Sequence, residues 1–324
     1  MRVLVAGAGA IGQWLGGRLW DAGLDVTLWT TPRHVAAFAK DGLCVRGESN
    51  LCWQPEATAD ARSLEPGFDA VVLTSKAHLT QTFAPEVARL CGPRGVAVSL
   101  QNGFGNGAKL AAHLPPARIA VALTSHGVQL EAPGQLLHAG TGATLVGPAD
   151  PDAAGAETVA CQLLGAAALS PEVHAHMRPF VWRKALVNHA INPVGALNRA
   201  TNGEILARPE LTALSHALLR EGEALAARGQ VRLPPGDLHA VLDETLRRTA
   251  ANRCSMLQDV DARRITEVET ITGRLVRLGE KLLASSPKSE AIYGRIKDLE
   301  ASYAGTEAAR RSAWDELPWE QQPF

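Results

Sequence analysis

The 324-residue sequence predicts an α/β protein with two domains, an N-terminal parallel-sheet domain followed by an all-helical domain. In the first half, strand-like runs alternate with helical stretches, which is typical of a parallel sheet covered on both faces. A glycine-rich turn directly joins the first strand-like run to the first helical stretch. From about Pro171 onward helical patterns dominate, and Gly229 and Pro287 interrupt them.

The strand-like runs of the first half are short and rich in β-branched residues. Between the first two of them, a helix is expected from about Ile11 to Ala22, with Gly23 ending it. Strands are expected at residues 2–6, 25–29, 70–74, 96–99 and 119–124, and a strand pair within 128–147 closes the domain. These elements place the sheet domain at residues 1–168, the helical domain at 169–304 and a loosely attached tail at 305–324.

The composition is that of a soluble globular protein, with 46% hydrophobic and 20% charged residues. A formal net charge of -1 gives no reason to expect nucleic acid or an anionic membrane as a partner. No apolar run reaches the roughly 18–20 residues that span a bilayer. The five cysteines are scattered and form no C-x-x-C pair, so we expect reduced thiols in the cytoplasm, without a disulfide or a metal site.

The glycine-rich turn reads Gly7-x-Gly9-x-x-Gly12 and therefore predicts a Rossmann-type dinucleotide site. In such a turn the first glycine permits the tight bend, the second lets the backbone approach a pyrophosphate, and the third lets helix and strand pack closely. The phosphates lie at the helix N-terminus, where free N–H groups favour negative charge. The expected cofactor-binding residues here are Gly7, Gly9, Ala10, Ile11 and Gly12.

The end of the second strand favours NADP(H) over NAD(H). NAD sites usually carry an acidic residue there that binds the ribose 2′-hydroxyl, and this chain has no carboxylate at that point. Arg33 is expected to meet a 2′-phosphate, and Thr31 adds a hydroxyl. Lys76 follows the strand at 70–74 and is expected to reach the cofactor, although its position alone fits a solvated surface lysine equally well.

The stretch from Trp182 to Pro193 places Lys184, Asn188 and Asn192 four residues apart, so they lie in a row along a helix. The rest of this helix is apolar nearly all round, which predicts that it is buried. Burying such a row costs several kcal/mol unless its members are hydrogen-bonded, so a site is expected there. The alternative is that the lysine reaches solvent and the asparagines bond nearby backbone.

Six segments together resemble the ketopantoate reductase family, over roughly residues 1–300. They are GAGAIG in the glycine turn, SKA at 75–77, QNG at 101–103, WRKALVNHAINP at 182–193, NGE at 202–204 and NRCSMLQDVDARRITEVETITG at 252–273. The resemblance implies NADPH-dependent reduction of 2-dehydropantoate to pantoate, on the pathway to pantothenate and coenzyme A. It also implies a helical domain of the 6-phosphogluconate dehydrogenase C-terminal type.

The resemblance assigns a role to seven polar residues. For catalysis it implies that Lys184 is the catalytic lysine, that Glu267 is a carboxylate partner, and that Asn102 stands near the nicotinamide and the substrate carbonyl. For substrate binding it implies that Asn188 and Asn192 contact the substrate hydroxyl and that Ser255 binds the substrate carboxylate. Asn252 is implied to bear on closure over the substrate. The chemistry agrees, because hydride transfer to a ketone leaves an alkoxide that needs a nearby cation and a proton.

Several positions depart from the family pattern. Thr31 stands where an arginine commonly reads the 2′-phosphate, and Arg253 is expected to widen specificity toward a more acidic 2-oxo acid. Asp259 is expected to form an ion pair with Arg263 along one helix face. Two other functions stay open: a reductase of a different 2-oxo or 3-oxo acid, and a protein that senses NADP(H) without turnover. The sequence does not decide the oligomeric state, and a homodimer stays open.

Overall fold

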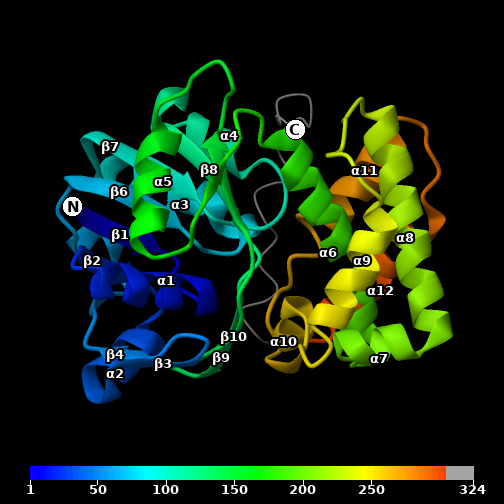
Figure 1. The fold of residues 1–324 in the computed structure, drawn as a ribbon, viewed down its shortest axis with the longest axis horizontal. Helices are drawn as coiled ribbons and strands as arrows, with labels where there is room; N and C mark the ends of the chain where they lie inside the picture. The colour runs from blue at the N-terminus through cyan, green and yellow to red at the C-terminus, as the bar shows by residue number, and fades with distance from the viewer. Residues whose placement is uncertain (304–324) are drawn as a thin grey trace. The chain divides into compact units, whose positions relative to one another are not determined.

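The computed structural model describes residues 1–303 and divides them into two compact units. Unit 1 comprises residues 1–101 and 105–177, and unit 2 comprises residues 102–104 and the described residues from Arg178 onward (Figure 1). The tail expected at residues 305–324 lies outside the described residues.

Unit 1 holds two sheets and the helices that cover them. Its strands are β1 (Arg2–Ala6), β2 (Asp25–Trp29), β3 (Leu43–Gly47), β4 (Leu51–Trp53), β5 (Glu56–Thr58), β6 (Phe68–Leu73), β7 (Cys91–Ser99), β8 (Ile119–Thr124), β9 (Gly127–Ala132), β10 (Gln135–Gly140), β11 (Thr144–Pro148) and β12 (Glu172–Val173). Its α-helices are α1 (Ala10–Asp21), α2 (Pro32–Asp41), α3 (Thr80–Leu90), α4 (Asn106–Ala111) and α5 (Ala156–Ala166), with 3-10 turns η1 (Ala61–Ser63), η2 (Ala77–Leu79) and η3 (Pro116–Arg118).

The larger sheet has the strand order β12-β11-β8-β7-β6-β1-β2-β5, and all its neighbours are parallel except β11 and β8. Side chains of β1 alternate between two cores, as a strand covered on both faces requires. Val3 and Val5 pack in the core that includes α1 and α5, whereas Leu4 and Ala6 pack in the core that includes α3. The parallel sheet expected from the sequence is therefore confirmed.

The smaller sheet has the order β4-β3-β10-β9, and it corrects the expectation that all cysteines are reduced. The antiparallel pairing of β3 with β4 places Cys44 directly opposite Cys52, and the two form a disulfide with a Cα–Cα distance of 4.2 Å. Strand register, rather than sequence spacing, brings the pair together. The argument from reduced thiols on which the cytoplasmic expectation rested is therefore wrong for these two residues. Within the described chain no three His, Cys, Asp or Glu residues form a metal-binding group.

Unit 2 is built from helices around one core. They are α6 (Arg178–Asn198), α7 (Asn202–Ala207), α8 (Pro209–Arg228), α9 (Leu238–Arg248), α10 (Ser255–Asp261), α11 (Thr272–Lys281) and α12 (Pro287–Ala301). The longest, α6, buries most of its residues on several sides, as its apolar composition predicts. No helix in residues 1–303 is long and apolar enough to cross a membrane.

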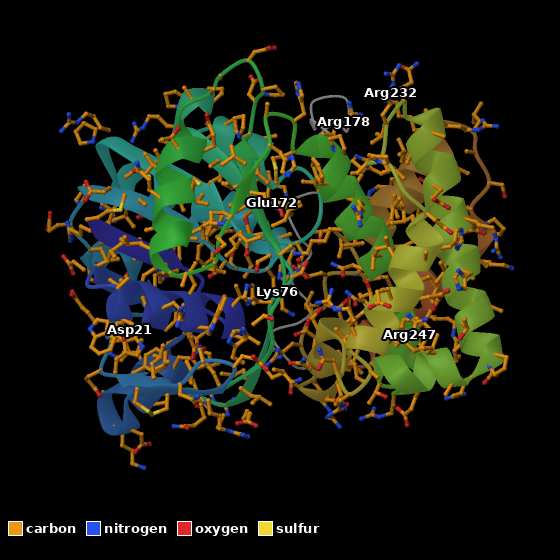
Figure 2. The ribbon with its side chains drawn as sticks, viewed as in Figure 1. Asp21, Lys76, Glu172, Arg178, Arg232 and Arg247 are labelled. Carbon is orange, nitrogen blue, oxygen red and sulfur yellow. A yellow bond between two sulfur atoms is a disulfide. The ribbon has the colours of Figure 1, made fainter. Side chains whose placement is uncertain are left out.

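The two units meet along the chain at Met177 and Arg178, later than the expected boundary after residue 168. The reason is strand β12, whose Glu172 pairs in parallel with Leu145 of β11 and so extends the larger sheet. Glu172 and Arg178 are labelled in Figure 2. The segment from 169 to 177 therefore belongs to unit 1, and the expectation that the chain is all-helical from 169 onward is wrong for it.

Candidate active site

The glycine turn between β1 and α1 has the geometry of a dinucleotide-binding turn. Gly7 has a φ of 73°, which a residue with a side chain rarely adopts. A Cβ at Gly12 would lie 2.3 Å from Thr74 Oγ1, so only glycine lets α1 pack this closely on the sheet. In contrast, a Cβ at Gly9 would meet nothing within 4 Å. The turn therefore leaves room above Gly9 at the N-terminus of α1, where a pyrophosphate fits.

The carboxyl end of β2 lies beside this turn, because the backbone N–H groups of Gly7 and Ala8 both donate to Trp29 O at 2.9 Å. The next residues, Thr31 and Arg33, are exposed at the start of α2. Arg33 has no hydrogen bond or ion pair with any described residue. Both residues are thus available to a ligand at this edge of the sheet.

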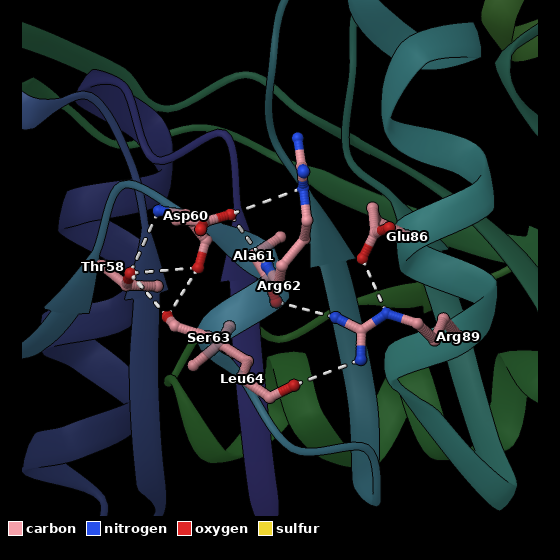
Figure 3. Close-up of polar contacts among 8 residues, drawn as sticks. All are labelled: Thr58, Asp60, Ala61, Arg62, Ser63, Leu64, Glu86 and Arg89. Carbon is pink, nitrogen blue, oxygen red and sulfur yellow. Dashed lines mark hydrogen bonds and ion pairs between the residues drawn. The ribbon is translucent and has the colours of Figure 1, made fainter.

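The neighbouring strand β5 does carry a carboxylate past its end, but its own loop engages it. Asp60 Oδ1 accepts a hydrogen bond from Arg62 N at 3.0 Å, and Arg62 Nε lies 3.9 Å away from the same oxygen (Figure 3). Arg89 of α3 anchors the same loop by donating to Ala61 O at 2.7 Å and to Leu64 O at 3.2 Å. The Asp60 side chain stays exposed, and it accepts a hydrogen bond from the backbone of its own loop rather than from a residue at the end of β2.

Lys76 lies just past the carboxyl end of β6, where it is half-buried (Figure 2). The loop that carries it is tied to the end of β7 by Gln101, whose Nε2 donates to Ser75 O at 2.9 Å and to Thr80 Oγ1 at 2.9 Å. Gln101 therefore fixes the loop on which Lys76 stands.

The row predicted on α6 exists. Lys184 and Asn188 are half-buried and Asn192 is buried, all on one continuous helix. Neither asparagine side chain forms a hydrogen bond within residues 1–303, although Asn192 O accepts one from Cys254 Sγ. The interpretation in which these amides bond nearby backbone is therefore wrong. Both amides keep their hydrogen-bonding capacity for a ligand.

Glu267 and Asn102 complete a cluster in unit 2 with Lys184. Asn102 Nδ2 donates to Glu267 Oε2 at 3.1 Å. Burial lowers the pKa of Lys184 from its ordinary value of 10.5 to about 8, and the charge of Glu267 opposes this decrease. The cluster thus contains a lysine with a pKa of about 8 and a carboxylate whose charge favours the protonated amine, and the Asn102 amide hydrogen-bonds that carboxylate.

Residues 102–104 and 265–271 bring these side chains together. Phe104 packs on Trp182 of α6 with ring centroids 4.9 Å apart, which fixes the segment that carries Asn102. On the other side, the buried carboxylate of Glu300 accepts hydrogen bonds from Thr266 N at 2.8 Å and Thr266 Oγ1 at 2.7 Å. Glu267 follows Thr266 directly, so its backbone is anchored within unit 2.

The predicted carboxylate-binding segment has a different internal pairing than expected. Asp259 pairs with Arg264 at 3.1 Å rather than with Arg263, because α10 ends at Asp261 and Arg263 has a φ of 50°. Arg253 forms an ion pair with Asp261, the same carboxylate that Arg199 binds at 2.6 Å.

Two other residues of this segment have ligand roles implied by the resemblance, and the structure gives their positions. Ser255 is exposed at the first position of α10, and Asn252 is half-buried before it. Between them, burial raises the pKa of the Cys254 thiol to about 11, so the thiol is protonated at neutral pH. Ser255 therefore stays available to a ligand, while Cys254 serves as packing.

One polar residue of α6 was missed by the sequence reasoning. His189 is fully buried and lies between Thr272 and Ser289, with ring nitrogens 3.0 Å and 3.1 Å from their hydroxyl oxygens. The signal for it was a histidine on the apolar side of a buried helix, away from the lysine row.

Comparison with known families identifies the class of protein that this fold and this cluster define. The profile of the family described as Ketopantoate reductase PanE/ApbA matches residues 3–151, and the profile described as Ketopantoate reductase PanE/ApbA C terminal matches residues 176–300. These matches define an NAD(P)H-dependent oxidoreductase. The chain belongs to the ketopantoate reductase family.

Individual relatives support the same assignment. The 2-dehydropantoate 2-reductase of Archaeoglobus fulgidus is 32% identical over 300 residues, which cover 93% of this chain and 98% of that protein. The 2-dehydropantoate 2-reductase of Pyrococcus horikoshii is 29% identical and covers 94% of this chain, with 100% of that protein matched.

Solved structures share the fold. The PanE/ApbA family ketopantoate reductase from Ralstonia eutropha JMP134 superposes with a TM-score of 0.84 at 25% identity, over 94% of this chain and 99% of that one. A D-mandelate dehydrogenase, solved with NADH and anilino(oxo)acetate, reaches a TM-score of 0.86 at 22% identity, over 94% of this chain and 99% of that one. At that identity the likeness concerns the fold alone.

Proposed function

We propose that this protein is an NADPH-dependent reductase of a branched 2-oxo acid, with 2-dehydropantoate as the first-choice substrate and pantoate as the product. The observation that carries the proposal is the cluster in unit 2. It contains a lysine with a pKa of about 8, a carboxylate that supports its charge, and two side-chain amides with free hydrogen-bonding capacity on the same helix.

The proposed reaction uses these groups in a defined order. When bound, the nicotinamide supplies a hydride to the 2-oxo carbon. Lys184 stabilises the negative charge that develops on the carbonyl oxygen and donates a proton from Nζ to it. A pKa near 8 suits this task, because the amine is protonated at neutral pH and still a strong enough acid.

The remaining side chains bind and orient the substrate. Asn188 and Asn192 would hydrogen-bond the substrate hydroxyl, and Ser255 would bind its carboxylate, with Asn252 bearing on closure. Asn102 orients Glu267 through the bond at 3.1 Å, and this keeps the carboxylate where it supports the charge of Lys184. Such orientation is worth several kcal/mol of the barrier when it is held in advance.

The features of unit 1 support NADPH as the cofactor. Gly7, Gly9, Ala10, Ile11 and Gly12 would hold the pyrophosphate, and Lys76 would add a positive charge. At the end of β2, Thr31 and Arg33 are exposed, and the residues from Thr30 to Arg33 include no carboxylate. A 2′-phosphate would therefore meet a cation there, where an NAD site would usually carry an acidic residue.

Replacing Arg33 tests this cofactor assignment. We expect Arg33→Ala to raise the KM for NADPH roughly 10- to 150-fold and to leave the KM for NADH unchanged, since one charge-assisted contact is worth roughly 1.5–3 kcal/mol. Steady-state kinetics with both cofactors measure this. Arg62→Ala is the matched control, because Arg62 is also exposed past the end of an adjacent strand and already faces Asp60. Equal losses with both cofactors in Arg33→Ala would contradict the assignment.

The substrate is tested by following NADPH oxidation with a panel of 2-oxo and 3-oxo acids that differ in branching and in the length of the carbon chain. We expect 2-dehydropantoate to give the highest kcat/KM. Another acid ranking clearly above it would replace the first choice and keep the reaction type. Tight NADPH binding without oxidation of NADPH by any acid would support the non-catalytic sensor instead.

A further inference from the structure

A row of hydrogen-bonded polar side chains in unit 2, buried except for the half-buried Glu221, links four helices and passes through α6. The carboxylate of Glu221, on α8, accepts hydrogen bonds from Lys288 N at 3.0 Å and from Ser289 N at 2.8 Å, so it caps the start of α12. Ser289 Oγ donates to the same carboxylate at 2.7 Å. His189 of α6 and Thr272 of α11 continue the chain.

The direction of each hydrogen bond in this chain follows from counting protons. The Ser289 hydroxyl has one hydrogen, and it is donated to Glu221, so the hydroxyl must accept from His189 Nε2–H. His189 is neutral because burial lowers its pKa to about 4. Its Nδ1 therefore carries a lone pair and accepts from the Thr272 hydroxyl at 3.0 Å. Every polar side-chain atom of the histidine is satisfied, and only one tautomer fits.

These hydrogen-bonded side chains lie on the side of α6 that faces away from Lys184. His189 is five residues after Lys184, so it points ~140° away from the lysine row and into the helical core. Beside it, α8 packs closely on α6, because a Cβ at Gly222 would lie 2.4 Å from Leu186 Cδ2 and 3.8 Å from His189 Cδ2. His189 therefore lies at the close contact between α6 and α8.

At its other end, the chain reaches the segment that carries Glu267. Thr272 is the first residue of α11, and the turn before it is closed by short hydrogen bonds. Ile271 N donates to Glu267 O at 3.1 Å, and Gly273 N donates to Val268 O at 2.8 Å. A shift of Thr272 therefore moves Glu267 with it.

We propose that His189 is a positioning residue, which holds α6 and the start of α11 in the register that lets Glu267 act on Lys184. This inference rests on the proposed reductase function. His189 touches neither member of the pair, and it acts through Thr272. It is a role beyond packing, because a leucine of similar size would fill the same space but would leave Thr272 unheld.

Four substitutions separate positioning from packing. Thr272→Val keeps the shape and removes only the hydroxyl. His189→Asn keeps an acceptor near the place of Nδ1, His189→Gln keeps a donor near the place of Nε2, and His189→Leu keeps neither. Leu246→Ala is the control, since Leu246 is fully buried in α9 and has no part in the polar chain.

We expect Thr272→Val and His189→Gln to lower kcat about tenfold or more, because misplacement of a catalytic group by 1 Å costs up to about 100-fold. His189→Asn should retain more kcat than His189→Gln at a similar melting temperature. The basic limb of the kcat–pH profile should move to lower pH in Thr272→Val, with the Kd for NADPH unchanged. Leu246→Ala should lower the melting temperature and leave the pH profile in place.

The proposal is overturned if Thr272→Val keeps kcat within twofold of the parent and the basic limb of its pH profile within 0.2 pH units. It is also overturned if Leu246→Ala shifts the basic limb as Thr272→Val does. Its failure is distinguishable from failure of the reductase function. The pKa of Lys184 is measured directly, by the pH dependence of its ε-amine signal in an NMR spectrum or of its acylation rate. A lower pKa in Thr272→Val supports the proposal even in a protein that reduces none of the acids, and an unchanged pKa refutes it.

Discussion

Lys184→Met is expected to lower kcat by about 10²–10⁴-fold while the Kd for NADPH stays the same, because the change removes both the proton donor and the cation that faces the alkoxide. Single-turnover measurements with 2-dehydropantoate and NADPH, combined with NADPH titration by fluorescence, give the two quantities. An unchanged rate would refute the mechanism. Methionine matches the length and the apolar stem of lysine, so packing around α6 is kept.

The same variant should be at least as stable as the parent at neutral pH. The pKa of Lys184 is lowered to about 8 in the folded protein and is near 10.5 when unfolded, so the folded state disfavours the proton. That cost is fully present below pH 8 and decreases as the pH rises from about 8 to 10.5. In thermal melts at pH 7 and pH 9, the melting temperature of the parent should therefore rise relative to that of Lys184→Met as the pH increases. This result separates lost chemistry from lost folding.

Glu267→Gln is expected to move the basic limb of the kcat/KM–pH profile from about pH 8 to lower pH, by roughly one unit or more, and to lower kcat at neutral pH. The carboxylate raises the pKa of Lys184, so without its charge burial lowers that pKa further. Glutamine keeps an oxygen that accepts the hydrogen bond of Asn102 Nδ2. The change therefore removes the negative charge and keeps the shape of the side chain nearly unchanged. A full pH profile from pH 5 to 10 gives the answer.

Glu269→Gln is the matched control for this experiment. Glu269 lies two residues further on the same segment, and its carboxylate faces Arg277 at 2.6 Å and accepts from Tyr293 Oη at 2.6 Å. Its loss should affect stability and leave the basic limb in place. If both variants shift the limb equally, the effect comes from the segment as a whole, and the specific pairing of Glu267 with Lys184 is wrong.

Local patterns predicted the parts of this protein that depend on short stretches of chain. The glycine turn lies within one strand–turn–helix unit, so the spacing of its glycines is enough to predict a dinucleotide-binding turn. The lysine and asparagine row on α6 depends only on helical periodicity and on the apolar residues between its members. In both cases each contact joins residues that are fewer than about two helical turns apart in the sequence.

The errors arose where distant segments meet or where an element ends. The disulfide between Cys44 and Cys52 depends on the register of β3 against β4, which the spacing of cysteines does not reveal. The predicted ion pair between Asp259 and Arg263 does not form, because α10 ends at Asp261 and Arg263 lies beyond the helix. His189 was missed because its partners are 83 and 100 residues away in the chain.

The assignment of residues 102–104 to unit 2 determines how this enzyme can be dissected. A single cleavage after Met177 would give a C-terminal fragment without Asn102 and Phe104. That fragment would expose Trp182, which the Phe104 ring otherwise covers, and would leave Glu267 without its amide partner. Limited proteolysis at this junction should therefore yield helical fragments that aggregate, and a synthetic peptide spanning residues 100–106 should increase their solubility. The helical unit is thus not contiguous in the amino-acid sequence.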